Sequence, residues 1–405
     1  MTNPSGPAPG RPSLTPPPFP SALAQPPHAS AAAIPATVVT DAVVPVPARK
    51  GRSAPIWAIG ILAFVTVGLV GYFLTFLGAG ASLLGMVLAL VPLALVLVAV
   101  RLVDRWEPEP RGLVVFAVAW GAVAAVGIAL AVDLGITTLF GPADTPLREA
   151  LQSVVQAPIV EEVGKGLGLL LLFATARRAF DGPVDGIVYG ALIGAGFAFT
   201  ENIQYFAVSF LEGGAETVTA TFFVRGILSP FAHVMFTCLI GFALGLAARR
   251  GASFSAALGP WLLGLAGAIA LHALWNGSAV FGDFFALYVV LQVPLFVVFV
   301  LGVLMLRREE ARLTRTRLGE YAAAGWFTPQ EVEMLATSPG RRAGMAWART
   351  LRGDRTPVMR EFIADATRLA AARQRAITGR DPHAAHDEQE LLVKTAAARA
   401  ALFAP

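Results

Sequence analysis

Eight apolar segments, each about 20 residues or longer, constrain this chain more than any other feature of its sequence. A helix of about 20 apolar residues crosses the hydrocarbon core of a bilayer, which is about 30 Å thick. Only 14% of the residues are charged and the mean hydropathy is +0.65, whereas soluble domains carry about 25% charge. The sequence therefore predicts an all-α fold, a polytopic membrane helix bundle with about eight transmembrane helices. They lie near residues 56–77, 81–102, 112–136, 150–175, 184–210, 226–248, 257–280 and 285–306.

Basic residues alternate between successive loops of this arrangement. They gather before the first segment and after the second, fourth, sixth and eighth, whereas the opposite loops hold only Arg148 and Arg225 beside several acidic residues. By the positive-inside rule, both termini are expected in the cytoplasm of a multi-pass plasma-membrane protein. This placement also accounts for the net charge of +4, so we expect the lipid bilayer, and no nucleic acid, as a partner.

The sequence divides into three parts. Residues 1–53 are rich in Pro, Ala, Ser and Gly, which predicts a disordered N-terminal tail in the cytosol. Residues 54–306 contain the apolar segments and form the expected transmembrane domain. Residues 307–405 are rich in Arg and Ala, and Thr328, Pro329 and Glu331 have the form of a capping box with proline at the first helical position. We therefore expect a helical C-terminal extension in the cytosol.

Ionisable side chains lie deep inside four of the apolar segments. Each costs roughly 2.5 to 3.5 kcal/mol when charged at the bilayer centre, so a chain that keeps them is expected to use them. Counted from the non-cytosolic helix ends, the groups on all four segments lie within roughly 12 to 18 Å of the outer interface. Four helices therefore offer polar groups at one depth. These residues are Glu161, Glu162, Lys165, Glu201, His233 and His272.

Helical spacing groups some of these residues further. Lys165 is three residues from Glu162 and four from Glu161, so it can neutralise one carboxylate while the other acts. His272 and Asn276 share a helix face by the same rule. An internal ion pair would explain the Glu–Lys cluster alone, but the common depth of the other groups favours a functional site. The glycines that would permit close helix approach around it are Gly164, Gly166, Gly168, Gly190, Gly194 and Gly196, and the residues interpreted as structural are Trp120, Asp133 and Asp185.

Ordered motifs at these positions resemble those of the PrsW family of intramembrane proteases. EEVGK, ending at Lys165, is similar to the EExxK motif and FAFTE, ending at Glu201, to the FxxxE motif of that family. FAHVMFT around His233 and HALWN from His272 resemble its two histidine motifs, and DRWEPEP from Asp104 resembles its acidic loop. The resemblance covers about residues 54–306. The family is related to the CAAX-prenyl endopeptidases and bacteriocin-immunity proteins, which carry EExxxR and FxxxH instead.

The resemblance implies a hydrolase that cuts a peptide bond of a membrane-anchored protein, such as an anti-sigma factor, inside the membrane. Hydrolysis needs a base for water, stabilisation of the oxyanion and an acid for the leaving amine. We assign Glu161 or Glu162 as the base, assisted by Lys165, with Glu201 as a second carboxylate. His233, His272 and Asn276 are metal ligands or oxyanion donors. A catalytic Zn²⁺ on His233, His272 and Glu201 and a metal-free glutamate mechanism both stay open.

Two other classes of protein fit part of this pattern. A proton-coupled transporter also lines a cavity at mid-membrane with carboxylates and histidines, although the eight segments show no inverted repeat. A non-catalytic immunity or scaffold protein would keep the same groups as structural ion pairs. Assays of peptide cleavage and of transport in liposomes separate these classes.

Overall fold

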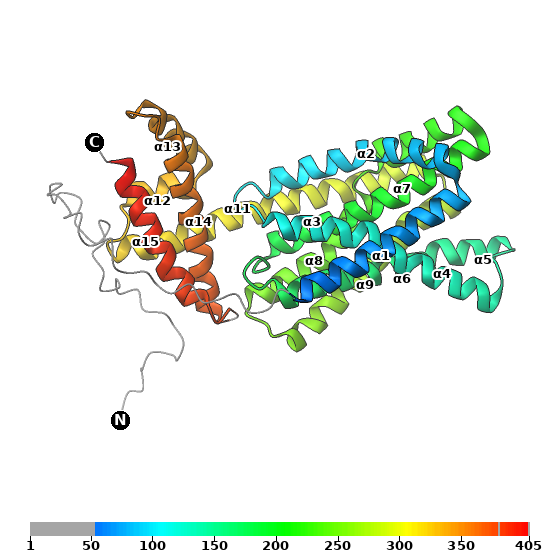
Figure 1. The fold of residues 1–405 in the computed structure, drawn as a ribbon, viewed down its shortest axis with the longest axis horizontal. Helices are drawn as coiled ribbons and strands as arrows, with labels where there is room; N and C mark the ends of the chain where they lie inside the picture. Colours follow the sequence, from blue (N-terminus) through cyan, green and yellow to red (C-terminus); the bar gives the residue numbers. More distant parts are fainter. Residues whose placement is uncertain (1–52, 380, 404–405) are drawn as a thin grey trace, which may run out of the picture. The chain divides into compact units, whose positions relative to one another are not determined.

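The computed structural model describes residues 53–379 and 381–403, and every regular element in these ranges is helical (Figure 1). The predicted N-terminal tail lies outside the described residues except for Ser53, where the first helix begins. The chain divides into a unit over residues 61–308 and a second unit that includes Glu309 onward, and each is described by itself. The predicted all-α fold class is confirmed.

Helices cover every apolar segment predicted from the sequence. Four of the elements are π-helical turns, labelled η2 to η5, that continue into α-helices. The elements are α1 (Ser53–Phe76), α2 (Gly78–Val103), α3 (Arg111–Ala119), η2 (Trp120–Ala125), α4 (Val126–Phe140), α5 (Pro146–Leu151), η3 (Gln152–Gln156), α6 (Ala157–Thr175), α7 (Pro183–Phe222), η4 (Phe223–Leu228), α8 (Ala232–Arg249), α9 (Phe254–Phe281), α10 (Phe284–Leu287), η5 (Tyr288–Gln292) and α11 (Val293–Ala323).

Five helical runs are long and apolar enough to cross a membrane, and the shorter Gly60–Phe76 is apolar as well, so the chain is a multi-pass membrane protein. The run from Pro183 to Arg249 contains two of the predicted segments. The segment over residues 150–175 is not among the five, and it carries Glu161, Glu162 and Lys165 close together. The number of eight crossings stays a prediction.

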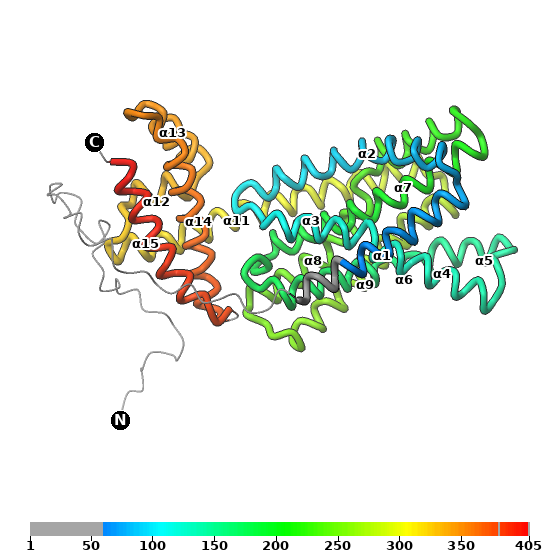
Figure 2. Tube along the Cα trace, viewed as in Figure 1, coloured from blue at the N-terminus to red at the C-terminus, as the bar shows by residue number. Residues whose placement is uncertain are grey.

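Helix α7 packs against α2, α8 and η2 and forms the centre of the membrane unit (Figure 2). Its side toward α8 carries glycines at Gly186, Gly190 and Gly194. A Cβ atom at Gly186 would lie 2.0 Å from the carbonyl oxygen of Gly241, and one at Gly194 would lie 2.6 Å from that of His233. Small residues therefore bring the two backbones into contact, as is common between membrane helices. This contact places His233 directly beside α7.

Prolines account for two of the π-helical turns. Pro158 follows η3 and Pro294 follows η5, each two residues after the wider turn ends. A proline ring clashes with the carbonyl group four residues earlier in a regular α-helix, and a wider turn relieves that clash. The turn η3 is functionally relevant because its residues Gln152 and Gln156 line cavities described below.

The second unit is a small helical bundle. It holds the end of α11 together with α12 (Pro329–Ala336), α13 (Ser338–Thr350), α14 (Thr356–Thr378) and α15 (Ala384–Leu402). The predicted capping box is present, because Thr328 Oγ1 accepts a hydrogen bond from Glu331 N at 3.1 Å and Glu331 Oε2 accepts one from Thr328 N at 2.8 Å. Its core includes Leu318, Trp326 and Phe362, so the unit has an apolar core of its own.

Candidate intramembrane site

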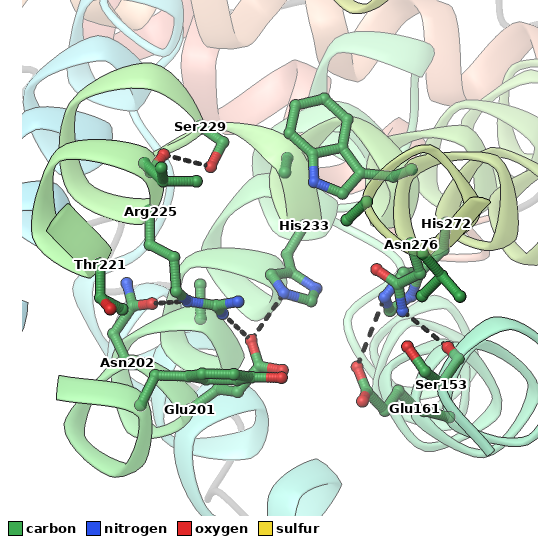
Figure 3. Close-up of a pocket in the computed structure, with 18 of the residues that line it drawn as sticks. Ser153, Glu161, Glu201, Asn202, Thr221, Arg225, Ser229, His233, His272 and Asn276 are labelled. Carbon is green, nitrogen blue, oxygen red and sulfur yellow. Dashed lines mark hydrogen bonds and ion pairs between the residues drawn. The ribbon is translucent and has the colours of Figure 1, made fainter. Parts of the chain in front are cut away.

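All seven residues predicted for the site come together where four helices meet. Helix α6 carries the Glu–Lys cluster, α7 the single glutamate, α8 one histidine and α9 the other histidine with the asparagine. A cavity of about 730 Å³ opens among them (Figure 3). Of the seven, those that line it are Glu161, Glu201, His233, His272 and Asn276. Glu162 and Lys165 have no exposed surface and lie behind this wall.

Lys165 holds the buried side of the site together. Its Nζ lies 2.7 Å from Glu162 Oε1, 3.3 Å from Glu161 Oε2 and 3.0 Å from His233 Nδ1. The ammonium group also lies 3.8 Å from the centre of the Phe197 ring. An ammonium group only donates hydrogen bonds, so Nδ1 of His233 accepts one and the ring proton is on Nε2. Lys165 therefore pairs with both carboxylates and fixes the tautomer of His233.

Glu162 orients the second histidine. Its Oε1 lies 3.0 Å from His272 Nδ1, and its Oε2 accepts a hydrogen bond of 3.2 Å from Thr237 Oγ1. The carboxylate accepts from Nδ1–H, which leaves Nε2 of His272 with its lone pair. Nε2 lies 4.0 Å from Glu161 Oε2 (Figure 3). The free lone pair and the cavity-lining carboxylate therefore face each other across a gap that suits a water molecule or a metal ion.

Arg225 was not among the residues predicted for the site. It lies in η4, where it pairs with Glu201 Oε2, donates from Nε to Asn202 Oδ1 at 2.7 Å and stacks 3.8 Å above the Tyr205 ring. Nε2–H of His233 donates to the same oxygen of Glu201 at 2.8 Å. Sequence reasoning placed Arg225 in a loop outside the membrane. The signal for its role was an isolated arginine within the apolar run that leads into His233.

Asn276 connects two walls of the cavity. Its Nδ2 donates to the carbonyl oxygen of Ser153 at 2.8 Å, which ties α9 to η3 (Figure 3). An amide nitrogen carries two hydrogens, so one N–H of Asn276 is left for another acceptor.

Two of the residues interpreted as structural have structural contacts. Trp120 Nε1 donates to the carbonyl oxygen of Gly164 at 3.0 Å, and Asp185 Oδ2 accepts from the backbone N–H of Gly182 at 2.7 Å at the start of α7. Asp133 differs, because its Oδ1 accepts hydrogen bonds from Gln152 and Gln156 beside a second cavity.

A metal ion would find three suitable ligand atoms in this cavity. Atoms of Glu161, His233 and His272 all lie within 4.8 Å of one another, and two imidazoles with a carboxylate are a familiar donor set for catalytic zinc. His272 already has the carboxylate partner on its other nitrogen that orients a metal-binding histidine. His233 would have to release one hydrogen bond, since both of its ring nitrogens are paired. The structure groups Glu161 with the histidines, whereas Glu201 is paired with Arg225 and His233.

Comparisons with known proteins show what the region around this site is similar to. Residues 109–301 match the family model described as PrsW family intramembrane metalloprotease. Protease PrsW of Geobacillus kaustophilus (strain HTA426) is 31% identical over 144 residues, which cover 36% of this chain and 58% of that relative. Protease PrsW of Bacillus subtilis (strain 168) is 37% identical over 79 residues, which cover 20% and 33%.

These matches confirm the resemblance that the motifs predicted. The chain spans less than two thirds of the length of each of these two curated relatives, at 58% and 33%. No solved structure gives a significant match to the chain. The matched region contains all seven residues of the site, because it runs from residue 109 to residue 301.

Proposed function

Because residues 109–301 match the PrsW family, we propose that this protein is an intramembrane endopeptidase that hydrolyses a peptide bond of a membrane-anchored protein. The observation that carries the proposal is the pair formed by Glu161 Oε2 and His272 Nε2, which lie 4.0 Å apart and both line a cavity between the helices. Charged groups at this depth are costly and mark functional sites in membrane proteins. A cavity that admits water beside a carboxylate is what hydrolysis requires.

Glu161 is the carboxylate that accepts the proton of the attacking water. Glu162 is fully buried and already paired with Lys165, His272 and Thr237, so it has no access to water in the cavity. Glu161 lines the cavity. Lys165 contacts the Glu161 carboxylate at 3.3 Å but does not shield that carboxylate from the cavity. The two glutamates of the EExxK motif therefore have different tasks, since one acts on water and the other orients His272.

Donors on the cavity wall can stabilise the oxyanion that forms when water adds to the carbonyl carbon. The second N–H of Asn276 and the guanidinium group of Arg225 are both on the lining. After the attack, Glu161 holds the proton taken from water and passes it to the leaving nitrogen, which completes the exchange. His233, held between Lys165 and Glu201, fixes the positions of these charges relative to one another.

The donor set of Glu161, His233 and His272 fits Zn²⁺. When bound there, the ion would acidify a water molecule and polarise the scissile carbonyl group. Removing metal with a membrane-permeant chelator separates the two mechanisms, because only the metal-dependent one loses activity and recovers it when zinc is returned.

The proposed substrate is a membrane-anchored protein, of the kind represented by an anti-sigma factor. Both termini of the protease lie in the cytoplasm, and residues 1–53 and 307–405 flank the transmembrane domain without contributing to the seven site residues. Reporter fusions placed after Arg178 and after Gly213 are expected on opposite sides of the membrane. Finding both on one side would contradict this orientation.

The test is a comparison of membrane-protein fragments from cells that carry the wild-type protein or Glu161→Gln. Glutamine keeps the shape of the side chain and removes the base, so fragments present with wild type should vanish while the protein still inserts. Glu216→Gln, the same chemical change at an exposed position, serves as the control. Identical fragments in all three samples would refute the proposal. Proton-coupled uptake by the protein in liposomes, without any cleavage, would select the transporter class instead.

A further inference from the structure

A second cavity, of about 380 Å³, lies beside the first between α4, the η3–α6 segment and α7. The two cavities share Gln152, Ala157, Glu161, Glu201 and Tyr205 in their linings. They therefore adjoin at the two carboxylates, with one cavity on each side. A polypeptide held at Glu161 needs room on both sides of its scissile bond, and this arrangement provides it.

The wall of the second cavity carries amide side chains. Asp133 Oδ1 accepts hydrogen bonds from Gln152 Nε2 at 2.8 Å and from Gln156 Nε2 at 3.1 Å. A carboxylate only accepts hydrogen bonds, so both amides must turn their NH₂ groups toward Asp133. Their oxygen atoms face elsewhere, and no described residue donates a hydrogen bond to either of them. Gln204, three residues after Glu201 on α7, adds a further amide to the lining.

We propose that these amides form a subsite that binds the unwound backbone of the substrate on the α4 side of the scissile bond. This proposal rests on the proposed protease function, which defines the substrate as a membrane-anchored polypeptide. A peptide bond within a transmembrane helix has its N–H and C=O groups paired inside the helix, and unwinding exposes them to a medium without water. Each exposed group costs several kcal/mol unless it finds a partner. Glutamine offers both an acceptor and donors to such groups.

One short segment presents two of the amides. Gln152 and Gln156 are the first and last residues of the π-helical turn η3, and both line the second cavity. Their NH₂ groups converge on one oxygen of Asp133, so both amide oxygens are available to backbone N–H groups of one substrate segment. Val126, Ala129 and Leu130 form the apolar part of the lining, which suits the side chains of a membrane-derived segment.

Thiol labelling of full-length protein in liposomes tests this subsite directly. Cys238 is the single cysteine and is 1% exposed, so it should not react with a thiol reagent. Any labelling of the Gln156→Cys variant therefore reports on position 156. Val155→Cys is the matched control, because Val155 is 47% exposed and lines neither cavity. Both changes are made together with Glu161→Gln to prevent cleavage. A small charged methanethiosulfonate should label the first variant readily and the second poorly.

The probe is a leucine-rich peptide of about 20 residues that spans the bilayer and has a central Gly-Gly pair, compared with the same peptide without the pair. The interrupted peptide should slow labelling of the Gln156→Cys variant about tenfold or more, and the uninterrupted helix should not. Labelling that neither peptide slows would show that the cavity holds only water. Equal protection by both peptides, or no labelling of the variant in their absence, would likewise overturn the proposal.

Kinetics give a second, independent measurement. In protein that retains Glu161, Gln156→Leu should lower kcat/KM for the interrupted peptide about tenfold, the value of one hydrogen bond of about 1.4 kcal/mol. Val155→Leu should leave kcat/KM unchanged, and equal values for the two variants would contradict the subsite. If the wild-type protein cleaves nothing but the peptide still protects position 156, the protease function fails and the subsite stands. If the wild-type protein cleaves the peptide but the peptide does not protect position 156, the protease function stands and the subsite fails.

Discussion

Replacing Lys165 by methionine removes a buried cation that contacts both glutamates of the EExxK segment. The side chain has no exposed surface, and its Nζ makes contacts of 2.7 Å with Glu162, 3.3 Å with Glu161 and 3.0 Å with His233. Removing one partner of a buried ion pair costs roughly 3 to 5 kcal/mol, because the remaining charge is left without compensation. At about 2 to 4 °C per kcal/mol for a domain of this size, we expect the unfolding temperature to fall by about 10 °C.

The assay is thermal unfolding of the purified protein in detergent, with a matched lysine as control. Lys394 and Glu390 form an ion pair of 2.6 Å on α15, but both side chains are more than half exposed, at 53% and 54%. An exposed pair contributes about 1 kcal/mol or less, so Lys394→Met should change the unfolding temperature little. Equal losses for the two lysine variants would refute the assignment of Lys165 as the centre of the buried network.

A double substitution tests whether the loss comes from unpaired charge. In Lys165→Met with Glu162→Gln, the closest cation and the closest carboxylate are removed together, so less charge is left uncompensated. The double variant should therefore lose at least about 1 kcal/mol less than the sum of the two single variants. Additive losses would mean that packing of the lysine side chain, and not its charge, stabilises the site.

Three further predictions follow from positions on and around the site. Gly194→Ala places a Cβ atom 2.6 Å from the carbonyl oxygen of His233, so it should destabilise the protein by about 1 to 3 kcal/mol and, by displacing the histidine, lower the cleavage rate about 100-fold. Gly267→Ala is the control, because its Cβ atom meets its nearest neighbour at 3.6 Å and should change neither quantity. Thermal unfolding and cleavage rates measure both effects. Burial raises the pKa of Asp104 from 3.8 to about 6, so the contribution of its protonated form to stability is complete below about pH 4 and is lost as pH rises through 6. Asp104→Asn should therefore raise the unfolding temperature at pH 8 and leave it nearly unchanged at pH 4. A rise at pH 4 with no change at pH 8 would contradict this pH dependence. If zinc is bound by the histidines, elemental analysis of the purified protein should show about one zinc per chain, and His272→Ala should lose it.

The sequence alone was sufficient to predict the helices and the residues that come together at the site. Long apolar segments specify membrane helices because their length must match the hydrocarbon core, and the helices over residues 112–136 and 257–280 lie where this rule puts them. Costly charges inside such segments mark function for the same energetic reason, and all seven predicted site residues meet around one cavity. Helical spacing also placed both neighbouring carboxylates within reach of Lys165 and predicted that it neutralises one of them, whereas the structure shows contacts with both, at 2.7 Å to Glu162 and 3.3 Å to Glu161.

Only the tertiary structure decided which glutamate lines the cavity and which other groups surround it. Adjacent residues such as Glu161 and Glu162 differ by about 100° around a helix, so the rotation of α6 decides which of them lines the cavity. That rotation is set by packing against neighbouring helices, including the hydrogen bond from Trp120 to the backbone of α6. Arg225 and the amides around Asp133 join the site through contacts between distant segments. Sequence periodicity describes neighbours within one helix, whereas these contacts depend on how separate helices pack against one another.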